Sequence, residues 1–563
     1  MRSHRLAAWG LAASAWLAGG VLAATEPAAS GDPLVDAGRR IYQEGQLPDG
    51  SPVQATRPEG FVLEGPQAAC VICHRESGMG SVEGSLDRTI LVPPVAGPLL
   101  FVPARFSDTF LDVSHHWVPN DAWARALTRS AYDEASLARA LREGWDPDGH
   151  PLMAPMPQYA LDDGAVSALA GYLRRLAAEP APGVEPDALH LATVVTPDAP
   201  PGQAEAVISV LRAWSATAQP SGSPWALHVW KLSGPPEQWP EQLESRYRER
   251  PVFALLSGVG GAEWGPVHRF CESNRVPCVL PALEVAPAAD EAFYPLYFSP
   301  GVTLEARILA AHWLAQIKGS DKAAGQLPEI VQVYADASGQ RAAESLTAAL
   351  GADAGSTRMQ RFRPTAPTAG LESMGPDSIL VLWLRPEEIE QLAALIPEGP
   401  RGSIVLSELL APPAVLSLPP AWKARLTYVS LFDDLGLQGE IARLRLKRWL
   451  DLQGLEPAPD PRPQADAYAA AYLFTRALGE IRGQELRRPP VPLVREHLLE
   501  MMEREANKYT DGTDLVDPDS HVAFYGRMSL GPKQRTAVRG GALLRYASPD
   551  SDRLVAASER IVP

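Results

Sequence analysis

The chain has 563 residues, with 67 acidic and 51 basic side chains and a formal net charge of -16 at pH 7. This length is enough for about three folding units, each able to bury its own core. An acidic chain is poorly suited to nucleic acid or to anionic lipid as a main partner, because both are bound by basic surfaces. Length and charge therefore favour a multidomain protein that meets other proteins or small ligands.

The N-terminus, residues 1–24, has the pattern of a signal peptide. Arg2 and Arg5 precede the apolar stretch LAAWGLAASAWLAGGVLA, and small residues offer a cleavage point near Ala23 or Ala24. The alternative is an uncleaved anchor helix, which the short, Ala- and Gly-rich run disfavours. No later stretch is long and apolar enough to span a bilayer. We expect a periplasmic protein in an oxidising compartment.

Proline marks the main boundary of the chain. The stretch AAEPAPGVEPDA cannot continue a helix, and it lies between a helical pattern and a strand pattern. We place a Pro-rich linker at 181–188, between a first domain at 25–180 and a second region at 189–563.

The first domain contains the motif CVICH. The C-x-x-C-H spacing allows Cys70 and Cys73 to form thioether bonds with haem vinyl groups, while His74 ligates the iron. A redox CxxC pair would not require the histidine, and half of a zinc site lacks a further Cys pair nearby. The spacing therefore predicts one covalent haem c.

The end of this domain, AVSALAGYLRRL, predicts a helix with one apolar stripe. The stripe residues are Val166, Leu169, Ala170, Leu173 and Leu176. Gly38 on an earlier helix would permit close backbone approach to this stripe, with Tyr42 and Tyr172 flanking the crossing.

Five stretches of this domain, AGRRIYQEG, CVICH, VPPVAGPLL, MPQYALDD and AVSALAGYLRRL, resemble a class I c-type cytochrome over most of residues 33–178. The resemblance implies an all-α domain whose first and last helices cross. It also implies that Met156, of the Met-Pro pair, is the sixth iron ligand. By the same analogy, the carbonyl of Pro93 or Pro94 accepts the Nδ1 proton of His74.

Other side chains compete for the sixth position. Met153 lies on the same loop, and His115 and His116 in an insertion would give bis-His ligation. An iron with both axial positions filled by protein is suited to electron transfer. Because no nucleophile with a base and no metal triad is visible, we do not expect an enzyme.

The second region alternates strand and helix patterns. Runs such as LHLATVV, PVFALLSG, EIVQVYA, SILVLWL and GSIVLSEL are apolar on both faces, and helical stretches separate them. This pattern predicts α/β structure with mainly parallel sheets covered on both sides. The region exceeds one such unit, so we expect two lobes, the first ending near residues 293–301.

Four stretches, VFALLSGVGGAEWGPVHRFCESNRVPCVLPALE, FYPLYFSPGVTLEARILAAHWL, IVQVYADASGQRAAESLTAAL and ADAYAAAYLFTRAL, resemble the type I periplasmic binding proteins, the branched-chain amino acid receptor group. The resemblance implies two lobes that close on a small ligand. Carried over by position, the candidate ligand contacts are Ser257, Gly258, Gly260 and Trp264 on the first lobe, and Tyr334, Asp336 and Glu408 on the opposite wall.

Some of these positions have simpler interpretations. SGVGGAEW replaces the Ser/Thr-rich patch that is usual in this family. An acid at a strand end, such as Asp336 or Glu408, often caps a helix. Trp264 at a helix start is as often core packing as a ligand contact.

The remaining cysteines, Cys271 and Cys278, are separated by a short helix-to-strand turn. In an oxidising compartment we expect them to form a disulfide. The alternative is a pair of buried free thiols.

Two functions follow. The first is an electron-transfer protein whose second domain docks a redox partner or senses a small molecule. Resemblance to binding proteins found alongside quinoprotein alcohol oxidation suggests a quinoprotein dehydrogenase as electron donor. The alternative is a solute receptor for an ABC transporter that carries an accessory haem. A polar cleft with a measurable ligand would favour the receptor, and a filled or flat cleft would favour docking.

Overall fold

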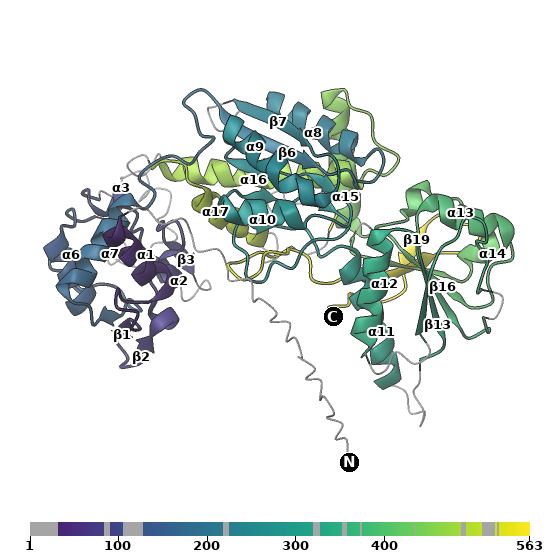
Figure 1. The fold of residues 1–563 in the computed structure, drawn as a ribbon, viewed down its shortest axis with the longest axis horizontal. Helices are drawn as coiled ribbons and strands as arrows, with labels where there is room; N and C mark the ends of the chain where they lie inside the picture. Colours follow the sequence, from purple (N-terminus) through teal and green to yellow (C-terminus); the bar gives the residue numbers. More distant parts are fainter. Residues whose placement is uncertain are drawn as a thin grey trace, which may run out of the picture.

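The computed structural model describes residues 32–83, 90–104, 128–217, 224–318, 327–351, 357–371, 374–433, 435–485, 491–508, 524–525 and 528–563. The predicted signal peptide, His115 and His116 lie outside these ranges. Figure 1 shows an N-terminal body at one end of the molecule and two α/β lobes beside it. Across the described ranges, no helix is both long and apolar enough to cross a membrane.

The N-terminal body is mainly helical. Its helices are α1 (Pro33–Glu44), α2 (Val71–His74), α3 (Gly97–Leu100), α6 (Glu134–Glu143) and α7 (Asp163–Arg175). The side chain of Asp32 accepts a hydrogen bond from Leu34 N to start α1, and Gly45 ends that helix in a left-handed conformation. Asp162 caps α7 in the same manner, by accepting from Ala165 N.

Short strands also occur in this body, so the expectation of a purely helical domain is corrected. Strands β1 (Gln54–Thr56), β2 (Val62–Glu64) and β5 (Gln158–Tyr159) form a small antiparallel sheet, and β3 (Ser81–Glu83) pairs with β4 (Ile90–Val92). Strands of two or three residues are too short to show a hydrophobic period. They pair the backbone groups of loops.

Helices α1 and α7 cross at Gly38. A Cβ atom added to Gly38 would lie 2.0 Å from Ala168 O and 2.7 Å from Tyr172 Cβ. The rings of Tyr42 and Tyr172 flank the crossing, with their centroids 5.4 Å apart. Only glycine permits this approach.

The first lobe is a parallel sheet between helices. Its strands are β6 (Leu189–Val195), β7 (Trp225–Lys231), β8 (Ala254–Leu256), β9 (Val259–Gly260), β10 (Cys278–Val279), β11 (Ala282–Leu283) and β12 (Pro295–Leu296). The helices α8 (Gln203–Thr217), α9 (Trp239–Glu249) and α10 (Gly265–Ser273) alternate with them. Strand β6 is buried along its whole length and pairs with β7, β8 and β9. A strand buried on both faces explains the continuous apolar run in the sequence.

The second lobe has a mixed sheet in the order β14-β13-β15-β16-β17-β18-β19. Its strands are β13 (Ile330–Tyr334), β14 (Thr357–Arg361), β15 (Ile379–Trp383), β16 (Ser403–Ser407), β17 (Leu426–Ser430), β18 (Ala542–Tyr546) and β19 (Leu554–Ala556). The accompanying helices are α11 (Val302–Lys318), α12 (Ala337–Leu350), α13 (Pro386–Leu395) and α14 (Pro420–Lys423). The last two strands are antiparallel and complete this lobe from the C-terminus.

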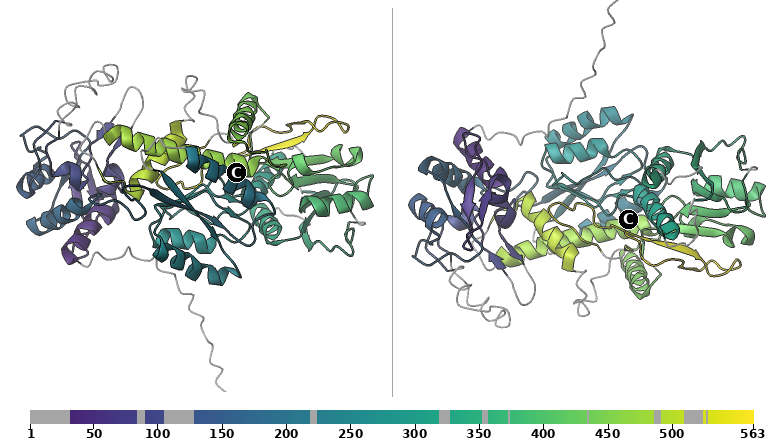
Figure 2. Two further views of the ribbon diagram at one scale, coloured as in Figure 1. Left: turned by 90° about the horizontal axis from the view of Figure 1, so that it is seen from above. Right: turned by 90° about the horizontal axis from the view of Figure 1, so that it is seen from below.

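The chain passes between the lobes more than once. After β17 it returns to the first lobe through α15 (Leu437–Gln453), α16 (Arg462–Glu485) and α17 (Arg495–Lys508), and then runs back to β18. Two of the segments that pass between the lobes lie side by side, because Tyr297 bridges to Thr536. Phe432, after β17, bridges to Tyr525 in the same way. Figure 2 shows α16 and α17 extending from the lobes toward the N-terminal body. We refer to residues 293–302 and 528–541 as the crossing segments.

We predict that Gly38→Ala lowers the free energy of unfolding of the N-terminal body by about 1–3 kcal/mol, because the added methyl group overpacks the helix crossing. Gly171→Ala on α7 is the control, since its Cβ would meet only Leu34 and Val35 atoms at 3.9 Å. Differential scanning calorimetry of both variants measures the effect. Equal losses in the two would contradict the tight crossing.

Candidate functional site

A cavity of about 490 Å³ lies in the N-terminal body. The CVICH segment contributes Cys70, Cys73 and His74 to its wall, and the later loop contributes Met153 and Met156. Apolar side chains complete much of the lining, among them Leu63, Val95, Leu100, Leu137, Leu141, Leu169 and Leu173. Two motifs far apart in the sequence thus meet at one apolar cavity.

His74 is held in one orientation. Its Nδ1 atom lies 3.0 Å from Pro93 O, so Pro93 rather than Pro94 is the partner of the ring. Burial lowers the pKa of His74 to about 4, against a smaller opposite effect of the Pro93 hydrogen bond. The imidazole is therefore neutral at neutral pH. Donation from Nδ1 to the carbonyl leaves Nε2 as a metal ligand.

Both candidate methionines line the cavity, but they differ in packing. Met156 packs against the helical core of the N-terminal body, and its backbone N donates to Met153 O at 3.1 Å. This packing supports Met156 as the residue whose sulfur would reach the iron. The choice between the two as sixth ligand stays a prediction.

The two thiols of the motif have different surroundings. Cys70 is buried, and burial raises the pKa of its thiol to about 12, so it stays protonated in the unmodified chain. Cys73 is half-buried, and Ile72 between them is 54% exposed. One edge of the motif thus reaches the surface. An imidazole, a thioether and two thiols around an apolar cavity fit the requirements of a covalently held haem.

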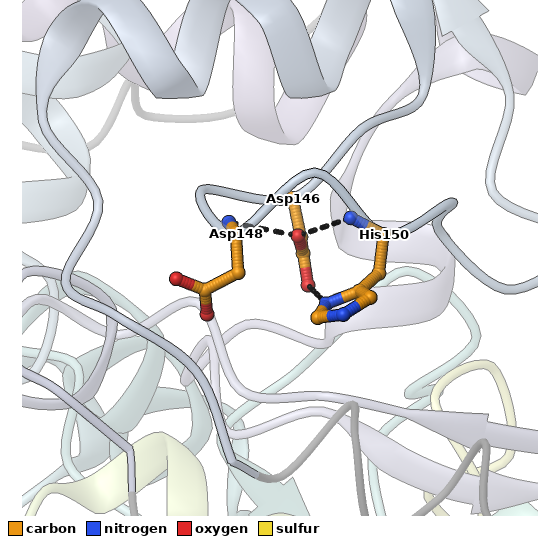
Figure 3. Close-up of side chains that lie close together, drawn as sticks. All are labelled: Asp146, Asp148 and His150. Atoms are coloured by element: carbon orange, nitrogen blue, oxygen red, sulfur yellow. Dashed lines mark hydrogen bonds and ion pairs between the residues drawn. The ribbon is translucent and has the colours of Figure 1, made fainter.

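Asp146, Asp148 and His150 lie close together on one turn (Figure 3), and Asp146 and His150 line the cavity. The Asp146 carboxylate accepts hydrogen bonds from Asp148 N at 2.9 Å and His150 N at 2.7 Å, and His150 Nδ1 lies 3.2 Å from it. Asp148 accepts from Ser130 N at 2.8 Å. Although these groups are close enough to hold a cation, their oxygens already stabilise the turn. We therefore give these residues a structural role in holding the turn, not a metal-binding one.

Two of the first-lobe residues predicted to contact a ligand, Gly258 and Gly260, lie against the indole of Trp264. Ser257 follows β8 with a φ of 53° and is 2% exposed. Cβ atoms added to Gly258 and Gly260 would lie 2.9 Å and 2.7 Å from Trp264 atoms. Trp264 is 1% exposed and belongs to the core of the lobe. The predicted ligand stacking of Trp264 is corrected: the two glycines make room for an indole that packs inside.

The residues predicted for the opposite wall follow the carboxyl ends of two strands of the second lobe, β13 and β16. Tyr334 ends β13 and is half-buried. Asp336 caps α12 by accepting from Gly339 N at 2.9 Å. Glu408 is 4% exposed, and its carboxylate lies 3.6 Å from Arg462 Nη1. Glu408 thus takes part in a buried ion pair, and its ligand contact stays a prediction.

An ion pair that the sequence did not reveal joins the two lobes. Glu284, after β11 of the first lobe, accepts from Arg385 Nη2 at 2.8 Å and from Ser338 Oγ at 2.6 Å, both on the second lobe. Arg385 also donates to Asp336 at 2.8 Å. The Glu284 side chain is 4% exposed. Glu284, Asp336 and Arg385 each follow a strand, and this position can be recognised in the sequence. Which acid pairs with which base across the two lobes cannot be read from the sequence alone.

Two buried acids lie near the lobe crossing. Glu305, on α11, accepts from Leu409 N at 3.1 Å and from Ser407 Oγ. Burial raises the pKa of Glu305 to about 8. Burial and the charge of Asp460 raise the pKa of Asp466, on α16, to about 8. Both acids are therefore largely protonated at neutral pH.

Cys271 and Cys278 form a disulfide, with their Cα atoms 6.1 Å apart. It ties α10 to β10 within the first lobe.

Neither a scan against protein-family models nor a search of curated proteins finds a match to the chain. Among solved structures, a branched chain amino acid ABC transporter from Thermus thermophilus with bound valine has a TM-score of 0.52 at 12% identity, covering 68% of this chain and 98% of that chain. A fatty acid ABC transporter substrate-binding protein from Thermomonospora curvata has a TM-score of 0.48 at 15% identity, covering 69% and 95%. At these identities the likeness concerns the fold. The described part of residues 189–563 forms two α/β lobes, an architecture like that of periplasmic binding proteins.

We predict that stability falls as pH rises from about 4.5 to about 8, by at most about 1.4 kcal/mol per pH unit for Glu305. The raised pKa means that the native state keeps a proton that the unfolded chain releases, so the stabilisation is full below the unfolded pKa and is lost toward pH 8. Glu305→Gln should flatten this dependence in urea denaturation. The exposed-site control Glu344→Gln should leave it unchanged, and a wild-type slope in Glu305→Gln would refute the assignment.

Proposed function

We propose that the chain is a periplasmic electron-transfer protein that carries one covalent haem c, joined to a domain built like a solute receptor. Cys70 and Cys73 hold the haem through thioether bonds, and His74 and Met156 are its axial ligands. When bound, the haem supplies one-electron transfer. The residues of the chain attach it, fix the imidazole through Pro93 and exclude water with apolar walls.

The observation that carries this proposal is the meeting of CVICH and the Met156 loop at one apolar cavity of about 490 Å³. The neutral, oriented imidazole of His74 adds to it. With His74 and Met156 both holding the iron, the haem would serve electron transfer rather than substrate chemistry. The exposed edge of the motif at Ile72 gives electrons a short path from a periplasmic redox partner. We propose a quinoprotein dehydrogenase as this partner.

A second candidate function is a solute receptor of an ABC transporter with an accessory haem. The fold comparison supports this function more directly than the first, because one similar structure is described as a branched chain amino acid ABC transporter with bound valine. The ion pair between Glu284 and Arg385 argues for a modified cleft, since it joins the lobes through the protein's own charges. A small polar ligand would have to compete with that pair or bind beside it.

The haem proposal is tested by expressing the full chain with a haem-attachment system and measuring its mass and its pyridine haemochrome spectrum. We expect one haem per chain. A double variant, Cys70→Ala with Cys73→Ala, should lose the covalent attachment. An intact wild-type chain without haem would refute the proposal.

The axial ligand is tested with Met156→Ala and Met153→Ala. We expect the sulfur-to-iron absorption at the red end of the ferric spectrum to disappear in the first variant and to persist in the second. The reverse pattern would identify Met153 as the ligand, and a wild-type ferric spectrum without this band would favour histidine ligation.

The receptor candidate is tested by thermal shift of the full chain with branched-chain amino acids and fatty acids. A ligand that binds only the folded chain raises its melting temperature by mass action. No shift at millimolar concentrations would leave the docking role as the function of the lobes.

A further inference from the structure

The segment predicted as a linker is fixed rather than free. Ala181 N donates to Leu493 O at 2.9 Å, and Pro182 O accepts from Arg495 Nη2 at 3.0 Å. A Cβ atom added to Gly183 would lie 2.1 Å from Phe253 N, so this backbone is pressed against the first lobe. The N-terminal body therefore has a defined position on the lobes.

An apolar contact reinforces this position. One buried cluster combines side chains of the N-terminal body with side chains that precede α17; its members are Met79, Ala96, Leu99, Ala177, Val491 and Val494. Apolar burial of this kind stabilises a domain interface. The N-terminal body thus meets the residues that precede α17 at a packed interface.

Two carboxylates of α17 bind the turn that follows His74. Glu500 accepts from Ser77 N at 3.0 Å and from Ser77 Oγ. Glu503 accepts from Arg75 Nη2. The Glu503 side chain is 4% exposed and that of Arg75 is 17% exposed. The residue directly after the axial histidine is therefore held by an acid from the receptor-like domain.

Glu503 has a second cationic partner on its other side. Arg535 Nη1 donates to Glu503 Oε1, and the Arg535 side chain is fully buried. Arg535 also donates to the carbonyls of Phe293 and Pro295, and its own carbonyl accepts from Tyr297 N at 2.8 Å. These contacts lie within the crossing segments. One carboxylate thus joins the CVICH turn to the chain segments that pass between the lobes.

We propose that Glu503 is a positioning residue for His74 and that it couples the haem to the arrangement of the two lobes. This inference rests on the proposed function, since it requires the haem. Lobes joined by crossing segments open and close about them. Because coupling is reciprocal, the state of the lobes sets the electron affinity of the haem, and the redox state of the haem biases the lobes.

Charge and burial supply the physical basis. Interactions between charges are strong where solvent is excluded. Ferric haem carries one more positive charge than ferrous haem, so a buried carboxylate beside it favours the oxidised form. Removing Glu503 would leave Arg75 and Arg535 without their shared anion and raise the reduction potential. Removing Arg75 would delete a cation and lower it.

The test compares wild type, Glu503→Gln and Arg75→Gln as full-length haem proteins. Spectroelectrochemical titration should give a higher midpoint potential for Glu503→Gln and a lower one for Arg75→Gln. Hydrogen exchange of residues 293–302 and 528–541, measured with dithionite-reduced and ferricyanide-oxidised protein, should differ between redox states in wild type. Both variants should lose that difference.

Glu505→Gln is the matched control, because it removes a buried acid from the same helix whose ion pair is with Arg476 instead. It should retain the redox-dependent exchange. Arg75→Gln keeps the test decisive if Glu503→Gln does not fold, since Arg75 is the more exposed partner. A wild type that carries haem but shows identical exchange in both redox states would overturn the coupling. Unmoved potentials in the variants would overturn the positioning role, whereas a wild type without haem would refute the proposed function itself.

Discussion

The arrangement of this molecule depends on how the buried acids of α17 are satisfied. A carboxylate removed from water is costly unless it is paired and hydrogen-bonded, and breaking such a pair leaves an uncompensated charge. Glu500 and Glu503 find their partners on the N-terminal body, and Glu503 also finds one in the crossing segments. Without the N-terminal body these acids would lose Ser77 and Arg75 as partners. The requirement to pair them therefore favours one relative position of the domains.

The same constraint gives the Pro-rich segment a different role from the one that its composition suggests. Proline at 180, 182 and 186 does end the helical pattern. However, the segment lies against the first lobe and α17 instead of acting as a tether. Composition indicates where a helix ends, but it does not indicate whether the following residues pack. In this chain the packing brings the CVICH turn to a receptor-like domain, which links the two halves physically.

Local patterns predicted much of the fold. The apolar stripe of α7 and the small residue at Gly38 are short-range features, and both predictions agree with the observed helix crossing. The C-x-x-C-H spacing is equally local, and its haem stays a prediction. The alternating apolar runs likewise gave the α/β lobes. The short strands of the N-terminal body were missed because two or three residues carry no periodic signal.

The polar contacts in the lobes were much harder to predict. Glu284 and Arg385 lie far apart in the sequence, and only the folded lobes bring them together. Trp264 and Glu408 occupy strand ends or helix starts, where exposure depends on neighbours such as Gly258 or Arg462 that sequence cannot place in space. Residue type and position along a strand identify candidates. Whether such a residue is buried, and which side chain it pairs with, depends on tertiary structure. These two properties determine which of the predicted contact residues a ligand could reach.

Solution X-ray scattering of the protein tests the central claim, that the N-terminal body and the lobes form one fixed unit, most directly. The account predicts that a single arrangement, with the N-terminal body against α17 as in Figure 1, reproduces the scattering curve. It also predicts that Glu500→Gln combined with Glu503→Gln broadens the distribution of distances. A wild-type curve that requires many orientations of the N-terminal body would contradict it.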